Sequence, residues 1–563
     1  MTLHPKNRWK VPQETARVAR ASFPKGNVYM KMYDELGTIY CDSDFLELFP
    51  ARCGKSAISP ARLALITVMQ FAEGLSDSQA ADAVRSRIDW KYVLGLDLTD
   101  SGFDSSVLSE FRNRLCEQGL ANKLLDLMLL RFQEKNLLKH RGKQRTDSTQ
   151  MIAAIRQVNR LELAGETLRA ALNEIATVAP EWLKQFISED WYERYRWRFD
   201  DYRLPKKKNE REEMAQQIGL DGHYLLDQVW QINDEGLRLR QLWSVEVLRR
   251  VWIQQYTFIN QQLIWRNPDS SGLPPNSICL ESPYDIEARN SSKRGMNWTG
   301  YKVHFTETCD QKNPNLITNV ETTPATTPDG EVTSTVHQKL ADKNLLPDEH
   351  LVDAAYVDAY QLVESHQDYQ VSLIGPVAID TSWQAKSQTG FDVSTFIIDW
   401  DKQVVQCPQG HLSRLWRNSH DTNGNSLVEV VFDRHTCGAC SVRNNCTSSA
   451  SAPRKLKLRP QAEYEALTTR RIEQLSQEFK QSYASRSGIE GTISQAVRRL
   501  DLRRTRYWGL AKTHLQNVAT ACAINLSRFF ASSNQIPKAQ TRTSTMEALR
   551  FQGNHPSEAL FVV

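Results

Sequence analysis

Four of the ten cysteines have spacings that suit metal binding. Cys437-Gly-Ala-Cys440 is a CxxC turn, Cys446 follows six positions later, and Cys407 opens a second tight turn, Cys407-Pro-Gln-Gly410. Four thiolates on two turn-based elements match the tetrahedral all-sulfur site that a structural Zn²⁺ prefers. We therefore expect a structural zinc bound by Cys407, Cys437, Cys440 and Cys446, in a closed site without an open position for catalysis.

Other interpretations of these cysteines stay open. An iron–sulfur cluster is a second possibility, although the spacings do not match the usual runs. Four unrelated reduced thiols are a third, because cytosolic cysteines stay reduced. If Cys407 is not a ligand, His411 or His435 could replace it.

Three acidic residues that are far apart in the sequence could form a second metal site. Asp147 lies in a predicted strand, Asp353 ends another strand, and Glu490 lies in the first turn of a helix that starts at Ser487. If the two strands are neighbours, their carboxylates converge at one edge of the sheet and Glu490 can lean over it. Such oxygen ligands suit Mg²⁺, and two ions can clamp the oxygens of an in-line phosphoryl displacement. Each residue also has a structural alternative: Asp353 could N-cap a helix, Glu490 could complete a capping box with Ser487, and Asp147 could be a turn residue.

Basic residues crowd around Glu490 in the sequence. Tyr507 and Trp508 are interleaved with them, and only Asp501 opposes them beyond Glu490 itself. An unbalanced basic segment beside a carboxylate site favours a polyanionic substrate, although a solvated helix face is the usual alternative. The basic residues are Arg486, Arg498, Arg499, Arg503, Arg504, Arg506 and Lys512.

The N-terminal part reads as a set of helices. Ser59-Pro60 predicts a helix start, Gly74 a helix end, and Ser76 with Gln79 the capping box of a second helix. Further helices are predicted after Asp104 and over about 120–135. Two helices joined by a tight glycine turn are compatible with a helix-turn-helix DNA reader or with a helical bundle for packing or dimerisation.

The rest of the chain alternates strands and helices. Strands are predicted at 144–150, 298–306, 316–322, 350–352 and 371–374, with helices after 332, over 358–366, 487–499 and 511–530. This order fits a mixed sheet with helices on its faces, interrupted by a helical segment over about 155–275 and by the cysteine-bearing segment.

Composition restricts the class of protein but not its substrate. The 563 residues are 40% hydrophobic and 24% charged, which is typical of folded globular proteins, and the formal net charge is only +4. The longest apolar runs are too short to span a bilayer, and the N-terminus lacks the apolar region of a secretory signal. We expect a cytoplasmic protein with no membrane partner.

Several motifs together resemble those of a known family. The run SPARLALITVMQFAEGLSDSQAADAVRSRIDWKYVLGL, followed by FDSSVLSEFRNRL, resembles the InsH-type N-terminal domain of bacterial insertion-sequence transposases. The motifs TDSTQM, SPYDIEAR, WTGYKVHFTETCD, HLVDAAYVDA, CPQGH, CGAC and YASRSGIEGTISQAVRRLDLRRTRYWGLAKTHLQNVATACAINLSRF follow in the order found in large DDE-class transposases with a cysteine-bearing insert. The resemblance covers about residues 40 to 530.

This resemblance implies a fold and a domain order. The fold class is α/β: a ribonuclease H-like mixed sheet with an N-terminal all-α domain, a helical insertion and a small zinc-ribbon-like insert. The expected parts are an N-terminal segment (1–40), a helical DNA-binding or dimerisation domain (41–138), the first part of the catalytic core (139–400), the zinc insert (401–452), the C-terminal core helices (453–532) and a flexible tail (533–563).

The resemblance also assigns roles to residues. Asp147, Asp353 and Glu490 take the positions of the catalytic carboxylates that bind two Mg²⁺ ions, with Mn²⁺ as a substitute. In related transposases the catalytic glutamate is part of a Tyr, Arg, Glu, Lys signature on one helix. Here Tyr483, Arg486 and Glu490 keep that spacing. Val497 occupies the Lys position, with Arg498 beside it. Arg and Lys are not equivalent as phosphate ligands.

The implied function is DNA transposition. The protein is expected to bind the terminal inverted repeats of its element as a homodimer on double-stranded DNA, to cleave a strand and to join the released 3′-hydroxyl to target DNA, associated with the nucleoid while bound. The alternatives are a catalytically silent DNA-binding regulator derived from a transposase, and a ribonuclease H-like DNA nuclease.

Overall fold

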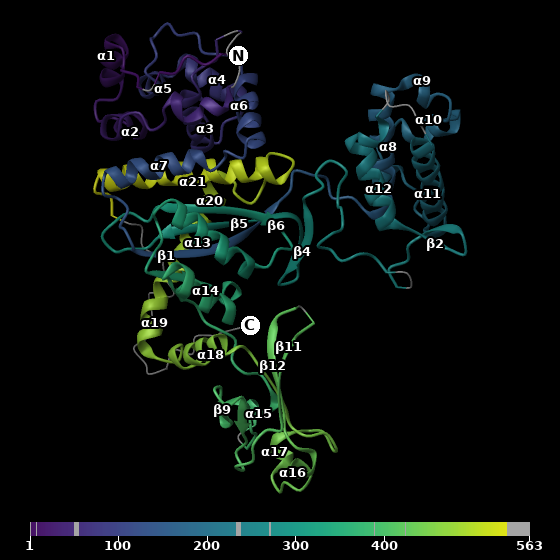
Figure 1. Cartoon of the computed structure of the whole chain (residues 1–563). Helices are drawn as coiled ribbons and strands as arrows, with labels where there is room; N and C mark the ends of the chain where they lie inside the picture. The colour runs from purple at the N-terminus through teal and green to yellow at the C-terminus, as the bar shows by residue number, and fades with distance from the viewer. Residues whose placement is uncertain are drawn as a thin grey trace, which may run out of the picture.

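The computed structural model describes residues 2–6, 8–49, 54, 56–231, 238–269, 272–387, 389–422 and 424–537. It is a mixed α/β structure in which three bodies surround one curled sheet (Figure 1). N-terminal helices lie above the sheet, a helical insertion forms a separate lobe to the right, and a cysteine-bearing lobe hangs below (Figure 1). Most of the tail expected to be flexible, from residue 538 onward, lies outside the described residues. Within these ranges, no helix has both the length and the apolar character needed to cross a membrane.

Local sequence signals set the N-terminal helices. The Ser59 side chain caps α3 (Pro60–Glu73) by accepting a hydrogen bond from the Arg62 N–H, and Gly74 ends this helix in the left-handed conformation. Ser76 and Gln79 form the predicted capping box of α4 (Asp77–Ser86). These predictions are confirmed, whereas α1, α2 and α5 were not predicted. The remaining elements here are α1 (Gln13–Ser22), α2 (Val28–Leu36), η1 (Asp42–Leu48), α5 (Ile88–Leu94), α6 (Ser106–Glu117) and α7 (Lys123–Glu134).

The central sheet has the strand order β4-β5-β1-β7-β8, and β6 also pairs with β5. β1 (Lys143–Ile152) is antiparallel to β5 (Met296–Thr308) and parallel to β7 (Glu349–Val352), so it lies between the two. All five predicted strands are present, and the edge strand β4 was not predicted. The other elements are β4 (Arg289–Lys293), β6 (Ile317–Pro324), η4 (Asp329–Glu331), α13 (Val332–Asp342), η5 (Ala354–Tyr356), α14 (Ala359–Tyr369) and β8 (Ser372–Ile374).

One hydrophobic core joins the N-terminal helices to the sheet. The long helix α21 (Leu510–Ser533) packs against α3 and α7 with one side and against β6 with the other. Phe132 of α7 stacks on Phe529 of α21, with ring centroids 5.7 Å apart. Because α3 is buried along most of its length, its residues serve packing.

The insertion after β1 has a core of its own. Its buried residues include Leu168, Ile218, Val251 and Trp252. The helical prediction holds up to Gln255, after which the chain forms a β-hairpin that was not predicted. The elements are α8 (Arg160–Val178), α9 (Pro180–Leu183), α10 (Glu189–Tyr195), η2 (Asp201–Arg203), α11 (Lys208–Gln231), η3 (Leu239–Gln241), α12 (Trp243–Gln255), β2 (Tyr256–Ile259) and β3 (Gln262–Trp265).

The cysteine-bearing lobe also has its own small core, which includes Phe396, Val430 and Leu456. After this lobe, α18 (Gln461–Glu473), α19 (Gln477–Ala484), η7 (Ser485–Ser487) and α20 (Gly488–Leu500) lead back to the sheet. The lobe contains α15 (Trp383–Lys386), η6 (Val393–Thr395), β9 (Ile397–Asp399), β10 (Val404–Gln406), β11 (Leu415–His420), β12 (Ser426–Val431), α16 (Arg434–Gly438), α17 (Arg443–Cys446) and β13 (Lys455–Leu458).

Candidate active site

Asp147 and Asp353 lie next to each other at one edge of the sheet. The parallel register of β1 and β7 pairs Thr146 with Val352, so the next residue of each strand is one of the two aspartates. Asp353 follows the end of β7 and caps η5 by accepting a hydrogen bond from the Ala354 N–H. The capping alternative for Asp353 is therefore also realised, and it leaves the other carboxylate oxygen available.

Glu490 joins this pair through a single arginine. Arg486 lies in η7, one turn before Glu490 in α20. Its Nη2 lies 2.9 Å from Asp147 Oδ2 and 3.5 Å from Asp353 Oδ2, and its Nη1 lies 3.0 Å from Glu490 Oε1. One guanidinium group thus contacts all three carboxylates. The capping-box alternative for Glu490 is wrong, because the Ser487 side chain makes no cap and donates instead to the Ala484 carbonyl.

The three carboxylates differ in burial. The Asp147 side chain is 16% exposed, whereas those of Asp353 and Glu490 are 46% and 64% exposed. Burial raises the pKa of Asp147, the positive charge of Arg486 opposes this shift, and the other two carboxylates add to it. Asp147 is therefore the anchored member of the set, and the other two side chains face solvent.

Tyr483 borders the same group of charges. Burial raises the pKa of Tyr483 to about 12, so it is a neutral hydroxyl at physiological pH. Its ring stacks on Phe479, with centroids 5.7 Å apart. Among the described residues, none accepts a hydrogen bond from the buried Nε of Arg486.

The set of carboxylates has the donor chemistry of a Mg²⁺ site, although no metal geometry is formed. In the described part of the chain, no group of three or more His, Cys, Asp or Glu side chains is arranged to hold a metal ion. At the sheet edge the guanidinium of Arg486 contacts each carboxylate. Hard oxygen ligands are what Mg²⁺ prefers, so the residues fit the ion once the guanidinium moves away.

A buried ion network that sequence reasoning missed holds α20 against the sheet. Glu307 of β5 is fully buried and pairs with Arg145 of β1 and Arg528 of α21, at 2.6 Å in both cases. The Thr492 hydroxyl of α20 donates to the same carboxylate at 2.7 Å. A signal for Glu307 was present, because Tyr301, Val303 and Phe305 alternate inward along β5 and Glu307 is the next residue in that series.

A close approach at Gly488 completes this contact. A Cβ atom added there would lie 2.2 Å from the Arg145 guanidinium, so only glycine lets the start of α20 approach the sheet this closely. Arg145 thereby sets the position of the turn that carries Arg486 and Glu490.

A second buried network supports the sheet near Asp147. The Thr146 hydroxyl lies 2.7 Å from His350 Nε2, and His350 Nδ1 lies 2.8 Å from His337 Nε2. Burial lowers the pKa of His337 to about 4 and that of His350 well below its ordinary value. These imidazoles are therefore neutral in the folded protein.

The other predicted DNA-contacting residues are spread over three places. Arg498 is exposed on α20, two turns beyond Glu490. Arg503 donates to the Thr149 hydroxyl of β1 at 3.3 Å, and Arg504 is exposed beside it. Arg506 donates to the Leu75 carbonyl at 3.1 Å, so it joins the core to the N-terminal helices, and Lys512 is exposed near the start of α21. Only Arg486 of the basic set contacts the carboxylates.

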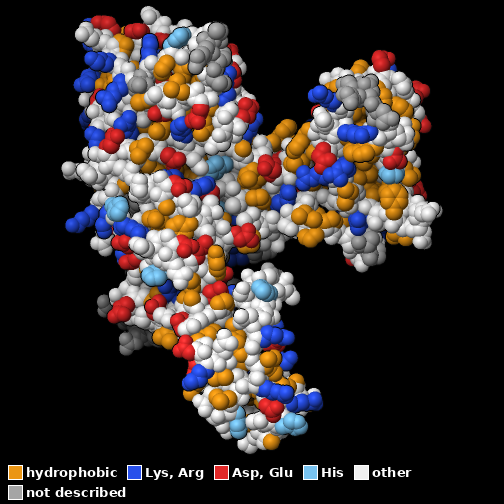
Figure 2. Space-filling view, in the orientation of Figure 1, with side chains coloured by type: hydrophobic (Ala, Val, Ile, Leu, Met, Phe, Trp, Pro, Cys, Tyr) orange, Lys and Arg blue, Asp and Glu red, His pale blue; other side chains and the backbone are white. Residues whose placement is uncertain are grey.

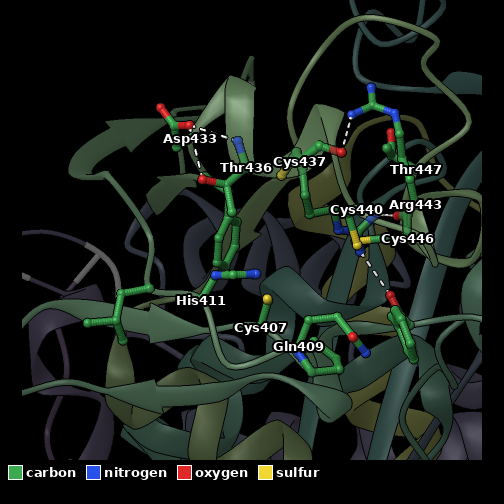
Figure 3. Close-up of a pocket in the computed structure, with 15 residues that line it drawn as sticks. Cys407, Gln409, His411, Asp433, Thr436, Cys437, Cys440, Arg443, Cys446 and Thr447 are labelled. Carbon is green, nitrogen blue, oxygen red and sulfur yellow. Dashed lines mark hydrogen bonds between the residues drawn. The ribbon is translucent and has the colours of Figure 1, made fainter.

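The four expected zinc ligands border one cavity in the lower lobe. Cys407, Cys437, Cys440 and Cys446 line a cavity of about 40 Å³ (Figure 3). Cys437 and Cys440 come from one turn, whereas Cys407 and Cys446 come from other segments of the lobe. Burial raises the pKa of the Cys446 thiol, and the other three cysteines add to that shift. His411 also lines the cavity, whereas His435 does not. The sulfur atoms are thus gathered in one place, without a formed metal geometry in the described residues.

Comparisons with known proteins identify two segments. Residues 406–530 match the family described as transposase DDE domain, and residues 18–114 match the transposase domain DUF772. The first segment contains the four cysteines, Arg486 and Glu490; Asp147 and Asp353 precede it. No curated protein and no solved structure matches the chain. The two matches support the resemblance of the chain to bacterial insertion-sequence transposases of the DDE class.

Proposed function

We propose that this protein is a DNA transposase that binds the terminal inverted repeats of its element and catalyses metal-dependent strand cleavage and strand transfer. The observation that carries the proposal is the contact of one guanidinium with three carboxylates from separate parts of the chain. The guanidinium gathers the three carboxylates around one positive charge, and the exposed Asp353 and Glu490 side chains would have to move inward to share a divalent ion with Asp147. The mixed sheet, with Asp147 and Asp353 on neighbouring strands, supports a ribonuclease H-like core.

Asp147, Asp353 and Glu490 would hold the divalent ions, Mg²⁺ or Mn²⁺. Ions bound there supply the positive charge that clamps the attacking and leaving oxygens during phosphoryl transfer. The protein's own part is to fix the donors: Asp147 is anchored in β1, and Glu490 is placed by the contacts of Gly488 and Thr492.

Arg486 has two roles in this proposal. Without DNA it neutralises the carboxylates, which would otherwise repel one another at the sheet edge. When DNA binds, it exchanges a carboxylate for a phosphate, a ligand that matches the fork of the guanidinium equally well. The exposed Arg498, Arg503 and Arg504 extend the phosphate-binding surface from there, while Tyr483 supplies a neutral hydroxyl. Arg506 and Lys512 would contact DNA that passes beside the N-terminal helices.

A structural zinc at Cys407, Cys437, Cys440 and Cys446 is part of the proposal. The chemistry of the donor set fits Zn²⁺, because four thiols line one cavity. The protein is further proposed to act as a homodimer that brings two element ends together.

The test compares two catalytic variants with a matched control. Asp147→Asn and Glu490→Gln should each lower Mg²⁺-dependent nicking of DNA that carries the element's ends by about 1,000-fold or more, with DNA affinity changed less than about threefold. Glu478→Gln, which alters an exposed carboxylate of α19, should nick at the rate of the unaltered protein. Retained nicking in Asp147→Asn or Glu490→Gln would show that the assignment is wrong.

A further inference from the structure

The three-stranded sheet of the cysteine-bearing lobe has two very different faces. In β13, Leu456 and Leu458 are buried, whereas Lys455 and Lys457 are exposed. The buried face joins the core that includes Val430 and packs against Cys407, Cys437 and Cys446. Alternation along a strand therefore separates an apolar face over the cysteines from an outward face that carries charge.

Register brings the charged residues of the outward face together. Arg417 of β11 pairs with Glu429 of β12, and Glu429 pairs with Lys457 of β13. Lys455 lies two residues along the same strand, opposite Val431. Arg417 and Glu429 form a salt bridge, and the positive charges of Lys455 and Lys457 act together with Arg417 to lower the pKa of Glu429. Three cations thus surround the one carboxylate that these strands, as described, place on this face.

Basic residues outnumber acidic residues in the cysteine-bearing lobe. Residues 396–460 contain nine Lys and Arg and five Asp and Glu, an excess of four that equals the formal net charge of +4 of all 563 residues. Lys and Arg side chains gather along the right-hand edge of the lower lobe, beside the hollow below the helical insertion (Figure 2). This segment is therefore net positive because it holds few acidic residues, although the whole chain is nearly balanced.

The side chains on this outward face favour duplex DNA over single-stranded DNA as its partner. None of the outward residues that these described strands pair there is aromatic, so the face offers no platform on which an unpaired base could stack. Spaced cations on a firm sheet suit a regular line of phosphates, such as that of duplex DNA.

The lobe is also attached to the catalytic core. Trp400 of the lobe packs against Tyr464 of α18, with centroids 5.8 Å apart. Arg470 of α18 donates to the Leu373 carbonyl of β8 at 2.7 Å. From α18 the chain continues through α19 to Arg486 and Glu490, so DNA bound at the lobe lies on a body that is connected to the active site (Figure 1).

We propose that the outward face of β11, β12 and β13, with Arg417, Lys455 and Lys457, binds the phosphate backbone of duplex DNA. This inference rests on the proposed function, in which duplex DNA is the substrate. It assigns the cysteine-bearing lobe a role as a second DNA-binding surface in addition to the basic residues around α20.

The test measures the salt dependence of binding in the full-length chain. Asp147→Asn serves as the parent, so that a labelled 40-base-pair duplex of arbitrary sequence stays intact, and anisotropy is followed over a range of KCl concentrations. Adding Lys455→Gln and Lys457→Gln should lower the slope of log K against log[KCl] by about 1.8, because each phosphate contact contributes about 0.9. Glu429→Gln should raise the affinity, since it frees Arg417 from its salt bridge.

A matched control and three outcomes decide the result. Lys207→Gln with Lys208→Gln removes two lysines that are 82% and 86% exposed on the helical insertion, and it should leave the slope unchanged. An unchanged slope in the Lys455 and Lys457 variant would overturn the inference, as would a larger effect on a 40-nucleotide single strand than on the duplex. If the parent binds no duplex, the proposed function fails as well, whereas a parent that binds with an unchanged variant slope refutes only this inference.

Discussion

The two clusters of candidate metal ligands differ in what surrounds their donor atoms. At the sheet edge, three carboxylates share the Arg486 guanidinium, and two of them are largely open to solvent. In the lower lobe, four thiols border a small cavity, where burial and neighbouring sulfurs favour protonation of Cys446. The first arrangement is balanced by a cation of the protein itself, and the second gathers neutral or partly buried thiols around a cavity. The carboxylates are thus balanced by a positively charged side chain, whereas burial favours the neutral form of the Cys446 thiol.

The largest effect is expected from the closed site. Cys437→Ser should lower the zinc content from about one ion per chain to none and unfold the lobe, because structural zinc contributes on the order of 10 kcal/mol to folding in small domains. Metal analysis and limited proteolysis measure the two effects. Cys309→Ser, which lies outside the cavity, should keep its zinc. Equal zinc in Cys437→Ser and the unaltered protein would remove the distinction between the two clusters.

A smaller effect is expected from acid on the sheet that carries the carboxylates. His337 has a pKa of about 4 in the folded protein, below its ordinary value, so the unfolded chain takes up a proton first as the pH falls. The contribution of this histidine to the free energy of unfolding is therefore fully present above pH ~6.5. It is lost as the pH falls towards ~4, by on the order of 3 kcal/mol.

Hydrogen exchange of the β1 and β7 amides at pH 7 and pH 4.5 checks this expectation. His337→Gln should reduce the loss of protection, because an amide can keep a hydrogen bond to His350 without titrating. His411→Gln alters an exposed histidine of the cysteine-bearing lobe and should leave the loss unchanged. Equal acid sensitivity in all three proteins would contradict the role of the buried imidazoles.

The smallest effect concerns the exchangeable cation itself. Arg486→Gln should tighten Mn²⁺ binding in the absence of DNA about tenfold, or ~1.4 kcal/mol, because the ion no longer competes with the guanidinium. Electron paramagnetic resonance of free Mn²⁺ measures the affinity. Arg503→Gln, whose side chain contacts Thr149 rather than a carboxylate, is the control. Weaker binding in Arg486→Gln would show that the arginine aligns the carboxylates instead of competing for them.

Sequence reasoning succeeded where the signal was local. The α3 and α4 boundaries follow from Ser59, Gly74 and the pair Ser76 and Gln79, all of which act within one helical turn. The carboxylate set was also predicted, although only the resemblance and the strand order linked its members. Helix α1 was missed because Pro12 precedes it and makes no side-chain cap, and β4 because its residues are polar.

Long-range contacts account for what could not be predicted. The contact between Arg486 and Asp147 spans 339 positions, and no periodicity in the sequence links an arginine to a carboxylate at that separation. The sequence placed Arg486 and Arg506 together as a phosphate-binding set, whereas the structure pairs the first with carboxylates and the second with Leu75. The cysteines were easier, because three of the four lie within ten residues of one another.

The core shared by the N-terminal helices and the sheet has a mechanical consequence. α21 packs on both bodies, and Arg506 donates a hydrogen bond to Leu75 just after α3, so the N-terminal helices and the carboxylates are connected by one continuous packed core. If the proposed function holds and these helices bind DNA, cleavage is expected at a constant number of base pairs from the bound site. The distance between the N-terminal helices and the carboxylates would then be set by side-chain packing rather than by a flexible linker.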